Sequence, residues 1–343
     1  MSHLDEKVIL ITGGTGSFGQ QFTDTVLKDH NPHAVRIFSR DELKQHEMAQ
    51  RLRHDSRARF FIGDVRDKER LYRAMKGVHI VVHAAALKQV PAAEYNPLEA
   101  VKTNIMGGAN VIDAAIDTGV EKVIFLSTDK AVRPVNLYGA TKLVAEKLCV
   151  QANAYAGGQK TRFSCVRYGN VVGSRGSVIP LFLEGRRNGV IRITDERMSR
   201  FWITLEQGAR FVIDCIARMG GGEIFVPKIP SMRLVDTART LAPNARWEII
   251  GMRPGEKVHE ELITADETPR VKEFATGYLI EPQHSFWDPM HNGDATPVPP
   301  DFEYRSDTNT AWMSPAELKA CIAESGHHLD DVSVLTGDGD AEP

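Results

Sequence analysis

The chain has 343 residues, of which 42% are hydrophobic and 25% are charged, and its formal net charge is −3. These values are typical of a soluble globular protein that is long enough for one large domain and a smaller one. A net charge so near zero provides no long-range attraction to nucleic acid or to an anionic membrane, so neither is an expected partner. We expect a small-molecule ligand instead.

The sequence also shows none of the common targeting or metal-binding patterns. Its N-terminal MSHLDEKVILITGG lacks the features of a secretory signal, and no apolar run approaches the roughly 18 to 20 residues that span a bilayer. Cys149, Cys165, Cys215 and Cys321 lie far apart, and His259 has no second His at ligand spacing. We therefore expect a cytoplasmic protein with reduced cysteines and no metal site.

Short β-branched runs alternate with helix-compatible stretches through the first half of the chain. These runs are KVILIT at 7–12, AVRIFS at 34–39, RFFIGD at 59–64, HIVVHA at 79–84, KVIFLS at 122–127 and TRFSCVRYG at 161–169. Because parallel strands need helical crossovers, the alternation predicts an α/β fold with a doubly wound, parallel, Rossmann-type sheet. We assign residues 1–175 to this nucleotide-binding domain.

The pattern changes after residue 176. A helix-like stretch at 178–189, a short strand at 190–194 and a helix at 204–219 predict a smaller mixed α/β substrate-binding region over 176–283, with some crossover of the chain. Residues 284–300 are rich in Pro, Asn, Asp and Gly and predict an irregular arm. Ser314 and Glu317 have capping-box spacing for a last short helix in 284–343, and the final residues predict a frayed tail.

A glycine-rich loop, ITGGTGSFG, follows the first predicted strand and opens a helix. Glycines at this place let the backbone approach a pyrophosphate, and the helix N-terminus offers N–H groups and a positive dipole to it. The loop therefore predicts dinucleotide binding rather than a merely structural turn. The loop residues expected to contact the cofactor are Gly13, Thr15, Gly16, Ser17, Phe18 and Gly19.

The end of the second predicted strand bears on the choice between NAD and NADP. An acid there binds the ribose 2′-hydroxyl of NAD, whereas an Arg neutralises the 2′-phosphate of NADP. Arg40 with Lys44 one helical turn on favours NADP, while Asp41 keeps NAD as the less favoured alternative. Taken alone, Arg40 could equally be a solvated surface residue. The remaining residues expected around the adenosine are Ser39, Asp64 and Val65, although an Asp that ends a strand is also an ordinary helix cap.

Tyr138 and Lys142 are four residues apart, which places both on one face of a helix. A nearby Lys ammonium favours the phenolate and lowers the pKa of Tyr, which can then act as a base toward an alcohol that is losing hydride. Tyr72 and Lys76 have the same spacing without this context. Tyr138 differs because it follows the fifth strand, on the side where open α/β sheets bind ligands.

At these residues the chain resembles the extended short-chain dehydrogenase/reductase family, whose members join such a glycine loop to a Ser/Thr, a Tyr and a Lys. Thr128, Tyr138 and Lys142 match this set. Asp129 and Lys130 resemble the inverting UDP-N-acetylglucosamine 4,6-dehydratases, since retaining 4,6-dehydratases carry Asp-Glu there. The segments SRDELKQ, AALKQVP, STDKA, YGATK, RYGNVVGSRGSVIP and RPGEK also look like that subfamily, and the resemblance covers nearly the whole chain.

The resemblance implies a lyase that uses tightly bound NADP, regenerated in each turnover, to start pseudaminic acid synthesis. Tyr138 would take the C4 hydroxyl proton as hydride leaves, a neutral Lys130 would remove the C5 proton, and a protonated Asp129 would donate to the C6 oxygen as water departs. A proton returned to the opposite face of C5 would invert that centre. Since an unperturbed Lys has a pKa of about 10.4, burial or Lys142 would have to lower the pKa of Lys130 by about 3.

The resemblance also implies a UDP-sugar substrate and a homo-oligomer, either a dimer or a hexamer. Arg253 is the best candidate for a phosphate contact because Pro254 and Gly255 mark a turn that would aim it inward, whereas Arg200 could equally form an ordinary surface ion pair. Further cofactor contacts are expected from Ala84, Lys88, Tyr138 and Lys142, and substrate contacts from Lys88, Asn170, Ser177, Val178, Pro180, Thr194, Arg200, Arg253 and Glu256.

Other functions remain open at this point. A retaining UDP-sugar 4,6-dehydratase or a UDP-sugar C4 epimerase could use the same scaffold, although Lys130 disfavours both. A catalytically silent NADP-binding regulator is an alternative of another class, in which Asp129 and Lys130 would be mere exposed charges at a strand end. The intact set of Asp129, Lys130, Tyr138 and Lys142 argues against it.

Overall fold

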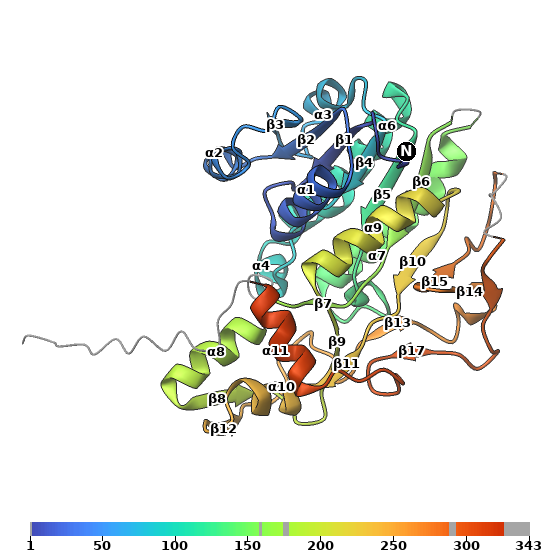
Figure 1. Cartoon of the computed structure of the whole chain (residues 1–343). Coiled ribbons are helices and arrows are strands. Elements are labelled where there is room, and N and C mark those ends of the chain that lie inside the picture. Colours follow the sequence, from blue (N-terminus) through green and yellow to red (C-terminus); the bar gives the residue numbers. More distant parts are fainter. Residues whose placement is uncertain (1, 158–159, 174–177, 288–292, 326–343) are drawn as a thin grey trace, which may run out of the picture.

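The structure is a computed structural model that describes residues 2–157, 160–173, 178–287 and 293–325 (Figure 1). Its centre is a 10-stranded sheet in the order β16-β14-β15-β10-β6-β5-β4-β1-β2-β3. The parallel strands are β1 (Val8–Thr12), β2 (Ala34–Ser39), β3 (Ala58–Ile62), β4 (Ile80–His83), β5 (Lys122–Leu126), β6 (Arg162–Val166) and β10 (Ile224–Pro227). The predicted doubly wound Rossmann sheet is thus confirmed.

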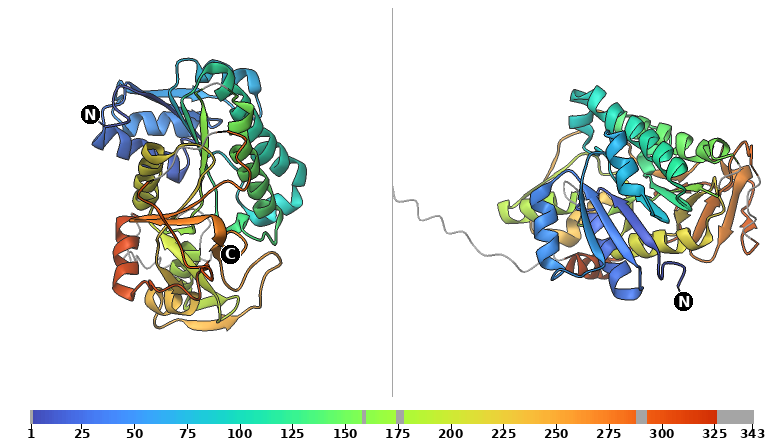
Figure 2. Two further views of the ribbon diagram at one scale, coloured as in Figure 1. Left: turned by 90° about the vertical axis from the view of Figure 1, so that its right-hand side faces the viewer. Right: turned by 90° about the horizontal axis from the view of Figure 1, so that it is seen from above.

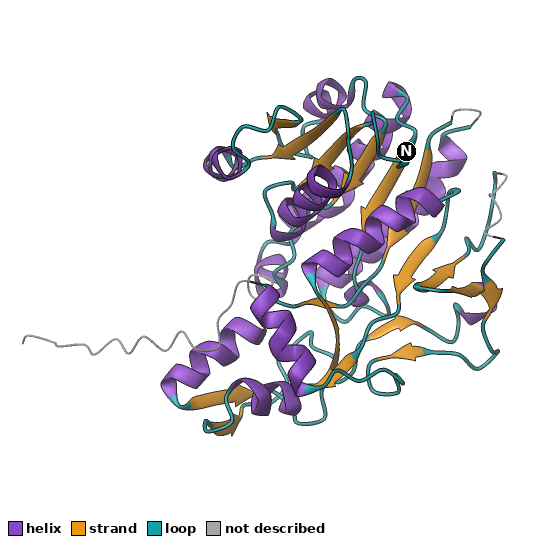
Figure 3. Cartoon of the chain, in the orientation of Figure 1, coloured by secondary structure: helices purple, strands orange, loops and turns teal. Residues whose placement is uncertain are grey.

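The sheet owes its position in the core to the near-continuous apolar runs of its central strands. Every residue of β1 and of β4 is buried, as expected for strands that are covered on both faces. Helices α1 (Ser17–Asp29) and α9 (Leu205–Arg218) pack against each other on one face of the sheet. Helices α3 (Lys68–Met75), α6 (Gly107–Thr118) and α7 (Leu137–Tyr155) cover the opposite face (Figures 2 and 3). Helix α2 (Glu42–Arg51) joins β2 to β3.

The segment between β4 and α6 forms short helices instead of a loop. It comprises α4 (Val90–Tyr95), α5 (Pro97–Ala100) and a single π-helical stretch, η1 (Val101–Met106), which continues into α6. Buried Asn104 fixes this segment, because its side chain accepts a hydrogen bond from the N–H of Leu87 at 2.8 Å and donates to the Leu87 carbonyl at 2.9 Å. The loop that carries Lys88 is therefore held at the end of β4.

A smaller region lies beyond the ends of the parallel strands and has a hydrophobic core of its own around Phe182, Trp202 and Leu318 (Figure 1, lower part). Its helices are α8 (Val178–Asn188), α10 (Leu234–Leu241) and α11 (Pro315–Glu324). Its strands pair as β11 (Ser231–Arg233), β9 (Ser199–Ile203) and β7 (Asn170–Val171), as β8 (Val190–Ile193) with β12 (Arg246–Ile249), and as β13 (Glu261–Ile263) with β17 (Tyr304–Arg305). The expected helix at 178–189, strand at 190–194 and helix at 204–219 are confirmed.

The chain crosses between the two regions more than once. After β9 it returns through α9 and β10 to the large sheet, where β14 (Val271–Phe274), β15 (Gly277–Ile280) and β16 (Thr296–Pro297) add an antiparallel edge. The expected boundaries at residues 175 and 283 stay a prediction. The expected irregular arm contains the short strand β16, and Trp287 in it donates its indole N–H to the Gly221 carbonyl at 3.1 Å.

The last described helix begins as its sequence indicates. Ser314 caps α11, and its hydroxyl and the Glu317 carboxylate satisfy each other's backbone N–H groups, which confirms the capping box. The expected frayed tail lies outside the described residues. In the part of the chain that is described, no helix combines the length and apolar character that crossing a membrane requires.

Candidate active site

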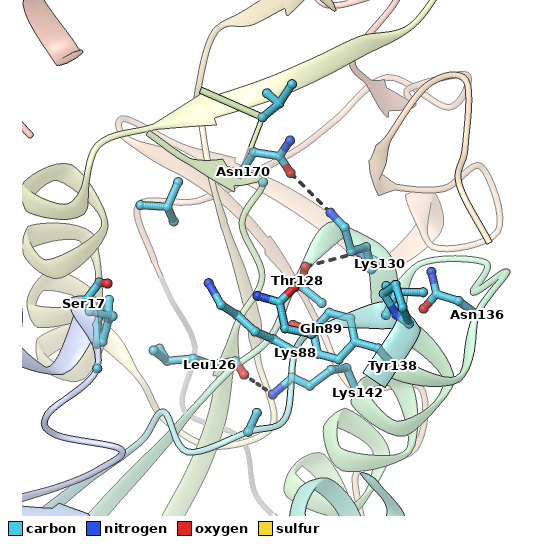
Figure 4. A pocket seen from close by; sticks show the side chains of 18 of the residues that line it. Ser17, Lys88, Gln89, Leu126, Thr128, Lys130, Asn136, Tyr138, Lys142 and Asn170 are labelled. Carbon is cyan, nitrogen blue, oxygen red and sulfur yellow. Dashed lines mark hydrogen bonds between the residues drawn. The ribbon is translucent and has the colours of Figure 1, made fainter. Parts of the chain in front are cut away.

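A cavity of about 1180 Å³ lies where the parallel strands end and is lined from both regions of the molecule (Figure 4). This location follows the rule that open α/β sheets bind ligands beyond the carboxyl ends of their strands. The cavity brings together most of the residues that the sequence singled out. They are Gly13, Thr15, Gly16, Ser17, Phe18, Gly19, Ser39, Arg40, Asp41, Lys44, Asp64, Val65, Ala84, Lys88, Thr128, Lys130, Tyr138, Lys142, Asn170, Val178, Thr194, Arg200, Arg253 and Glu256.

Three predicted residues are placed differently. Asp129 is fully buried and does not line the cavity itself, although its side chain contacts both Thr128 and Lys130. Pro180 lies in the first turn of α8 but is not part of the lining. Ser177 lies outside the described residues.

The glycine-rich loop has the geometry of a phosphate cradle. Gly13 has a φ of +68°, and a Cβ there would lie 2.9 Å from the Ala85 backbone. A Cβ on Gly19 would lie 2.5 Å from the backbone of Gly14, so this glycine lets α1 pack closely on the loop. Helix α1 begins at Ser17, which faces the cavity (Figure 4). The loop thus fits a dinucleotide pyrophosphate.

The end of β2 presents cationic groups to the same cavity. Asp41 caps α2 by accepting a hydrogen bond from the N–H of Lys44 at 3.0 Å, and its other oxygen binds the Lys44 ammonium at 2.5 Å. The hydrogen bonds with Lys44 hold the pKa of Asp41 below its usual range. Arg40 is more than half exposed, and its Nη1 lies 3.5 Å from Asp64. Asp64 does not cap a helix, since Asp67 caps α3.

Helix α7 carries Tyr138 and Lys142, and its start is fixed by Asn136. The Asn136 side-chain oxygen accepts from the N–H of Gly139 at 2.8 Å, which makes Asn136 the N-cap of α7. A Cβ on Gly139 would lie 2.1 Å from the carbonyl oxygen of Lys130. Only glycine therefore lets α7 approach the Asp129–Lys130 turn this closely, and the approach brings Tyr138 beside Lys130 (Figure 4).

Burial is the largest influence on the pKa values of Tyr138 and Lys142. It raises the pKa of Tyr138 to about 12, against the opposing charge of Lys130. Burial lowers the pKa of Lys142, whose ammonium donates a hydrogen bond to the Leu126 carbonyl at 2.5 Å. The expectation that Lys142 lowers the pKa of Tyr138 is not met, because the Lys142 ammonium points to the end of β5.

Asp129 and Lys130 form the short helix η2 (Asp129–Ala131) directly after β5, with Thr128 as its cap. The Lys130 ammonium donates to Asp129 Oδ1 at 3.0 Å and to Asn170 Oδ1 at 3.2 Å. The Thr128 hydroxyl donates to the same Asp129 oxygen at 2.7 Å. Because these side chains turn inward, the alternative that they are exposed charges at a strand end is wrong.

The requirement of a lowered Lys130 pKa is also not met. Burial acts to lower the pKa of Lys130, but the carboxylates of Asp129 and Glu260 outweigh it, and the pKa lies above the ordinary value. Glu260, which contributes to this raised pKa, lies 130 residues away in the chain, and no local pattern links it to Lys130. Lys130 therefore rests as an ammonium ion in this structure.

The substrate end of the cavity is built from loops of the smaller region. Arg200 is not a surface ion pair: its guanidinium is largely buried and donates to the carbonyls of Ser199 at 2.7 Å, Val258 at 3.0 Å and Lys257 at 3.1 Å. Arg253 is exposed at the rim, where its backbone N–H donates to the Glu256 carboxylate at 3.1 Å. Arg253 is thus the predicted phosphate contact with the greatest freedom to reach a ligand.

Several lining residues were not predicted from the sequence. Glu260 is buried, and its Oε1 lies 3.7 Å from both Lys130 Nζ and Arg200 Nε. Asn136 links the start of α7 to the RPGEK loop by donating to the Gly255 carbonyl at 2.8 Å. Lys257 donates to the Val132 carbonyl at the far end of the η2 turn. Among the described residues, no cluster of His, Cys, Asp and Glu is arranged to hold a metal ion.

A doubly wound sheet with a glycine loop after β1 and a Tyr-Lys pair on α7 defines a Rossmann-fold protein of the short-chain dehydrogenase/reductase type. Residues 9–282 match the family described as "Polysaccharide biosynthesis protein", and the chain belongs to this family.

Relatives with assigned names include both dehydratases and epimerases. A "UDP-N-acetylglucosamine 4,6-dehydratase (inverting)" from Campylobacter jejuni is 53% identical over 327 residues, which cover 93% of this chain and 98% of that protein. A "UDP-glucose 4-epimerase" from Rickettsia rickettsii is 42% identical over 80% of this chain and 83% of that protein. Among solved structures, Pen from Bacillus thuringiensis is similar with a TM-score of 0.87 and 40% identity, over 94% of this chain and 99% of that one.

Proposed function

We propose that the protein is a hydro-lyase that dehydrates UDP-N-acetylglucosamine across C5 and C6 and inverts C5. The observation that carries the proposal is Lys130 beside Tyr138 at one cavity, with buried Asp129 hydrogen-bonded to Lys130 behind the lining. In addition, 93% of the chain aligns at 53% identity with a relative named for this activity. An epimerase that only oxidises and re-reduces C4 needs Tyr138 and Lys142 but no second acid–base pair.

The cofactor in this proposal is NADP. Its pyrophosphate would lie on the Gly13–Gly19 loop, and Arg40 and Lys44 would bind the 2′-phosphate. Asp41 is less available to a ribose hydroxyl, because it caps α2 and pairs with Lys44. Asp64 and Val65 would lie along the adenine. When bound, the cofactor supplies a reversible hydride acceptor for the C4 and C6 positions of the sugar.

Tyr138, Lys130 and Asp129 would move the protons. Tyr138, acting as the phenolate, takes the proton of the C4 hydroxyl as hydride leaves C4, and the resulting ketone makes the C5 proton acidic. Transfer of one proton along the 3.0 Å hydrogen bond from Lys130 to Asp129 converts the resting ion pair into a neutral amine and a carboxylic acid. The amine then takes the C5 proton while the acid protonates the departing C6 hydroxyl, so the original ion pair is regenerated as water leaves. With hydride returned to C6, a proton delivered to the opposite face of C5 completes the inversion.

The UDP part of the substrate would lie along the smaller region. Arg253 would bind a phosphate, and Glu256, Thr194 and Arg200 would surround the uridine. Lys88, held at the end of β4, and Asn170, next to Lys130, would contact the sugar or the diphosphate. Val178, which lines the cavity, would frame the nucleotide. The product would enter pseudaminic acid synthesis in the cytoplasm.

A homo-oligomer also belongs to this proposal. Tyr95, Leu98 and Met106 are exposed apolar side chains on α4, α5 and η1, and Val144 adds another on the neighbouring α7. Such a set is typical of a surface that another subunit covers. Light scattering should give the mass of a dimer or hexamer, and Leu98→Glu should lower it; a monomeric wild-type protein would contradict this part of the proposal.

Proton NMR of the purified protein with UDP-N-acetylglucosamine in heavy water tests the reaction. We expect a 4-keto-6-deoxy product with deuterium at C5 and inverted configuration at that carbon, without added cofactor. Retained C5 configuration would instead indicate a retaining dehydratase, and an unchanged sugar even with added NADP would overturn the proposal.

A C4 epimerase is the second candidate, and the 42% identical relatives named UDP-glucose 4-epimerase favour it. In the same NMR experiment, an epimerase would change the C4 configuration and leave the C5 proton and the C6 hydroxyl in place. Lys130→Ala separates the two candidates further, because a dehydratase loses C5 exchange whereas an epimerase keeps its C4 chemistry.

A further inference from the structure

Glu260 is a buried acid that the proposed mechanism does not use. Its side chain is 4% exposed, yet the residue belongs to the lining of the cavity. Its Oε2 has no hydrogen-bond partner among the described residues. A buried carboxylate oxygen without a partner lowers the stability of a fold, so stability alone does not account for this residue.

The position of Glu260 is fixed by backbone contacts that leave the carboxylate group to face two cations. Its N–H donates to Ser306 Oγ at 2.9 Å, and its carbonyl accepts from the N–H of Ser306 at 2.9 Å. Its Oε1 then lies 3.7 Å from Lys130 Nζ and 3.7 Å from Arg200 Nε. The Glu260 carboxylate is therefore shared by two cations. Of these, Arg200 also donates to three backbone carbonyls and Lys130 also pairs with Asp129.

The surroundings of Lys130 fit an ammonium ion better than a neutral amine. Its Nζ faces oxygens of Asp129 at 3.0 Å, Asn170 at 3.2 Å and Glu260 at 3.7 Å. An ammonium group has three N–H donors, and each can point at one of these oxygens. The other charged or titratable groups that act on Lys130 are Arg200, Lys257 and Tyr138.

We propose that Glu260 is a positioning residue that holds the Lys130 ammonium opposite Asp129 and Asn170 and stabilises its charged form. Glu260 therefore opposes the proton transfer from Lys130 to Asp129 that would produce the neutral amine. The kinetic consequences of this role rest on the proposed function, but the effect on Lys130 itself does not.

The direct test is a titration of Lys130 by carbon-13 NMR of its Cε, assigned through Lys130→Arg. The experiment uses the full chain in an Asp129→Asn background, where Glu260 is the remaining carboxylate that contacts the ammonium. We expect Glu260→Gln to lower the titration midpoint of Lys130 by about one pH unit or more. Glu261→Gln is the matched control, because it removes the same charge from the neighbouring residue. The Glu261 carboxylate pairs with Arg133 at 3.5 Å and not with Lys130.

An unchanged Lys130 midpoint in folded Glu260→Gln protein would overturn the proposal, and so would an equal fall in the Glu261→Gln control. Circular dichroism and thermal melting establish that each variant is folded. If Glu260→Gln fails to fold, Glu260→Asp moves the carboxylate away by one methylene and should still lower the midpoint. An unchanged midpoint there would count equally against the role of Glu260.

A second test uses the reaction. In otherwise wild-type protein, Glu260→Gln should reduce kcat by about 10-fold or more through misplacement of Lys130, with KM changed by less than about 3-fold. The limb of the pH–rate profile that Lys130 governs should move to lower pH. A large rise in KM with unchanged kcat would mean that Glu260 binds substrate instead. If the wild-type protein forms no 4-keto product, the proposed function fails, whereas the NMR titration still decides the role of Glu260.

Discussion

Arg167 at the end of β6 and Glu146 on α7 form a buried, doubly hydrogen-bonded ion pair, with distances of 3.1 Å from Nε and 2.8 Å from Nη2. Both side chains are 2% exposed. Glu146 also accepts a hydrogen bond from Ser127, the residue before Thr128, and Arg167 reaches Glu267 at 3.1 Å. One guanidinium thus connects the catalytic helix, the end of β5 and the segment that leads to β14.

Glu146→Ala should destabilise the protein by about 3 kcal/mol, because it leaves the Arg167 charge buried with Glu267 as its remaining carboxylate partner. Urea unfolding followed by circular dichroism measures the loss. Arg51→Ala on α2 removes an exposed ion pair with Asp24 on α1 and should cost less than about 1 kcal/mol. Equal losses in the two variants would mean that the buried pair has no special structural role.

Gly139→Ala should impair catalysis more than any other single methyl addition on α7. The new Cβ would meet the Lys130 carbonyl at 2.1 Å and must push α7 away from the Asp129–Lys130 turn. We expect a loss of about 100-fold in kcat. Gly208→Ala on α9 is the control, since the nearest atom there is 3.9 Å away and alanine favours a helix by up to about 1 kcal/mol. A fully active Gly139→Ala variant would contradict the close approach.

Tyr138 should resist ionisation in the protein without ligand. Burial raises its pKa to about 12, so the phenolate fraction stays small at neutral pH and grows only as the pH nears that value. The ultraviolet difference titration of wild type against Tyr138→Phe measures this directly at the phenolate band. We expect a midpoint above the ordinary value of about 10. A midpoint below 10 without any ligand would show that a cation already activates Tyr138.

Arg40→Ala should weaken NADP binding by about 10-fold and leave NAD binding nearly unchanged, because only NADP carries the 2′-phosphate. Calorimetry on cofactor-free protein gives both dissociation constants. Arg51→Ala, which removes a cation from the same helix region outside the cavity, should change neither constant. Equal weakening for both cofactors would point to a general electrostatic effect of Arg40.

Local patterns predicted the parts of the fold that depend on neighbouring residues. The β-branched runs before each helix predicted all the strands from β1 to β6, and the Ser314–Glu317 spacing predicted the start of α11. The glycine loop and the Tyr138–Lys142 pair were found because their chemistry needs fixed short spacings. Each of these patterns can be recognised in the sequence, because all of its residues lie within about a dozen positions of one another.

The missing parts of the site depend on contacts between distant segments. Glu260 approaches Lys130 only through the pairing of its own backbone with Ser306, and no local pattern records that pairing. The carboxylate of Glu260, which helps raise the pKa of Lys130 above its ordinary value, went unrecognised for the same reason. The need for glycine at position 139 was not predicted, although Gly139 was noted as part of YGATK. The Lys130 carbonyl that leaves no room for a side chain there belongs to a residue outside this motif.

The return of the chain through α9 and β10 limits how this protein can be re-engineered. Helix α9 packs against α1, and β10 extends the sheet beside β6, although both follow β9 of the smaller region in the sequence. Exchanging residues 176–283 as one cassette with a relative would therefore also replace the helix that packs on α1 and the strand that pairs with β6. Swaps intended to change the accepted sugar should be confined to the segments 178–203 and 231–260, with the intervening helix and strand kept native.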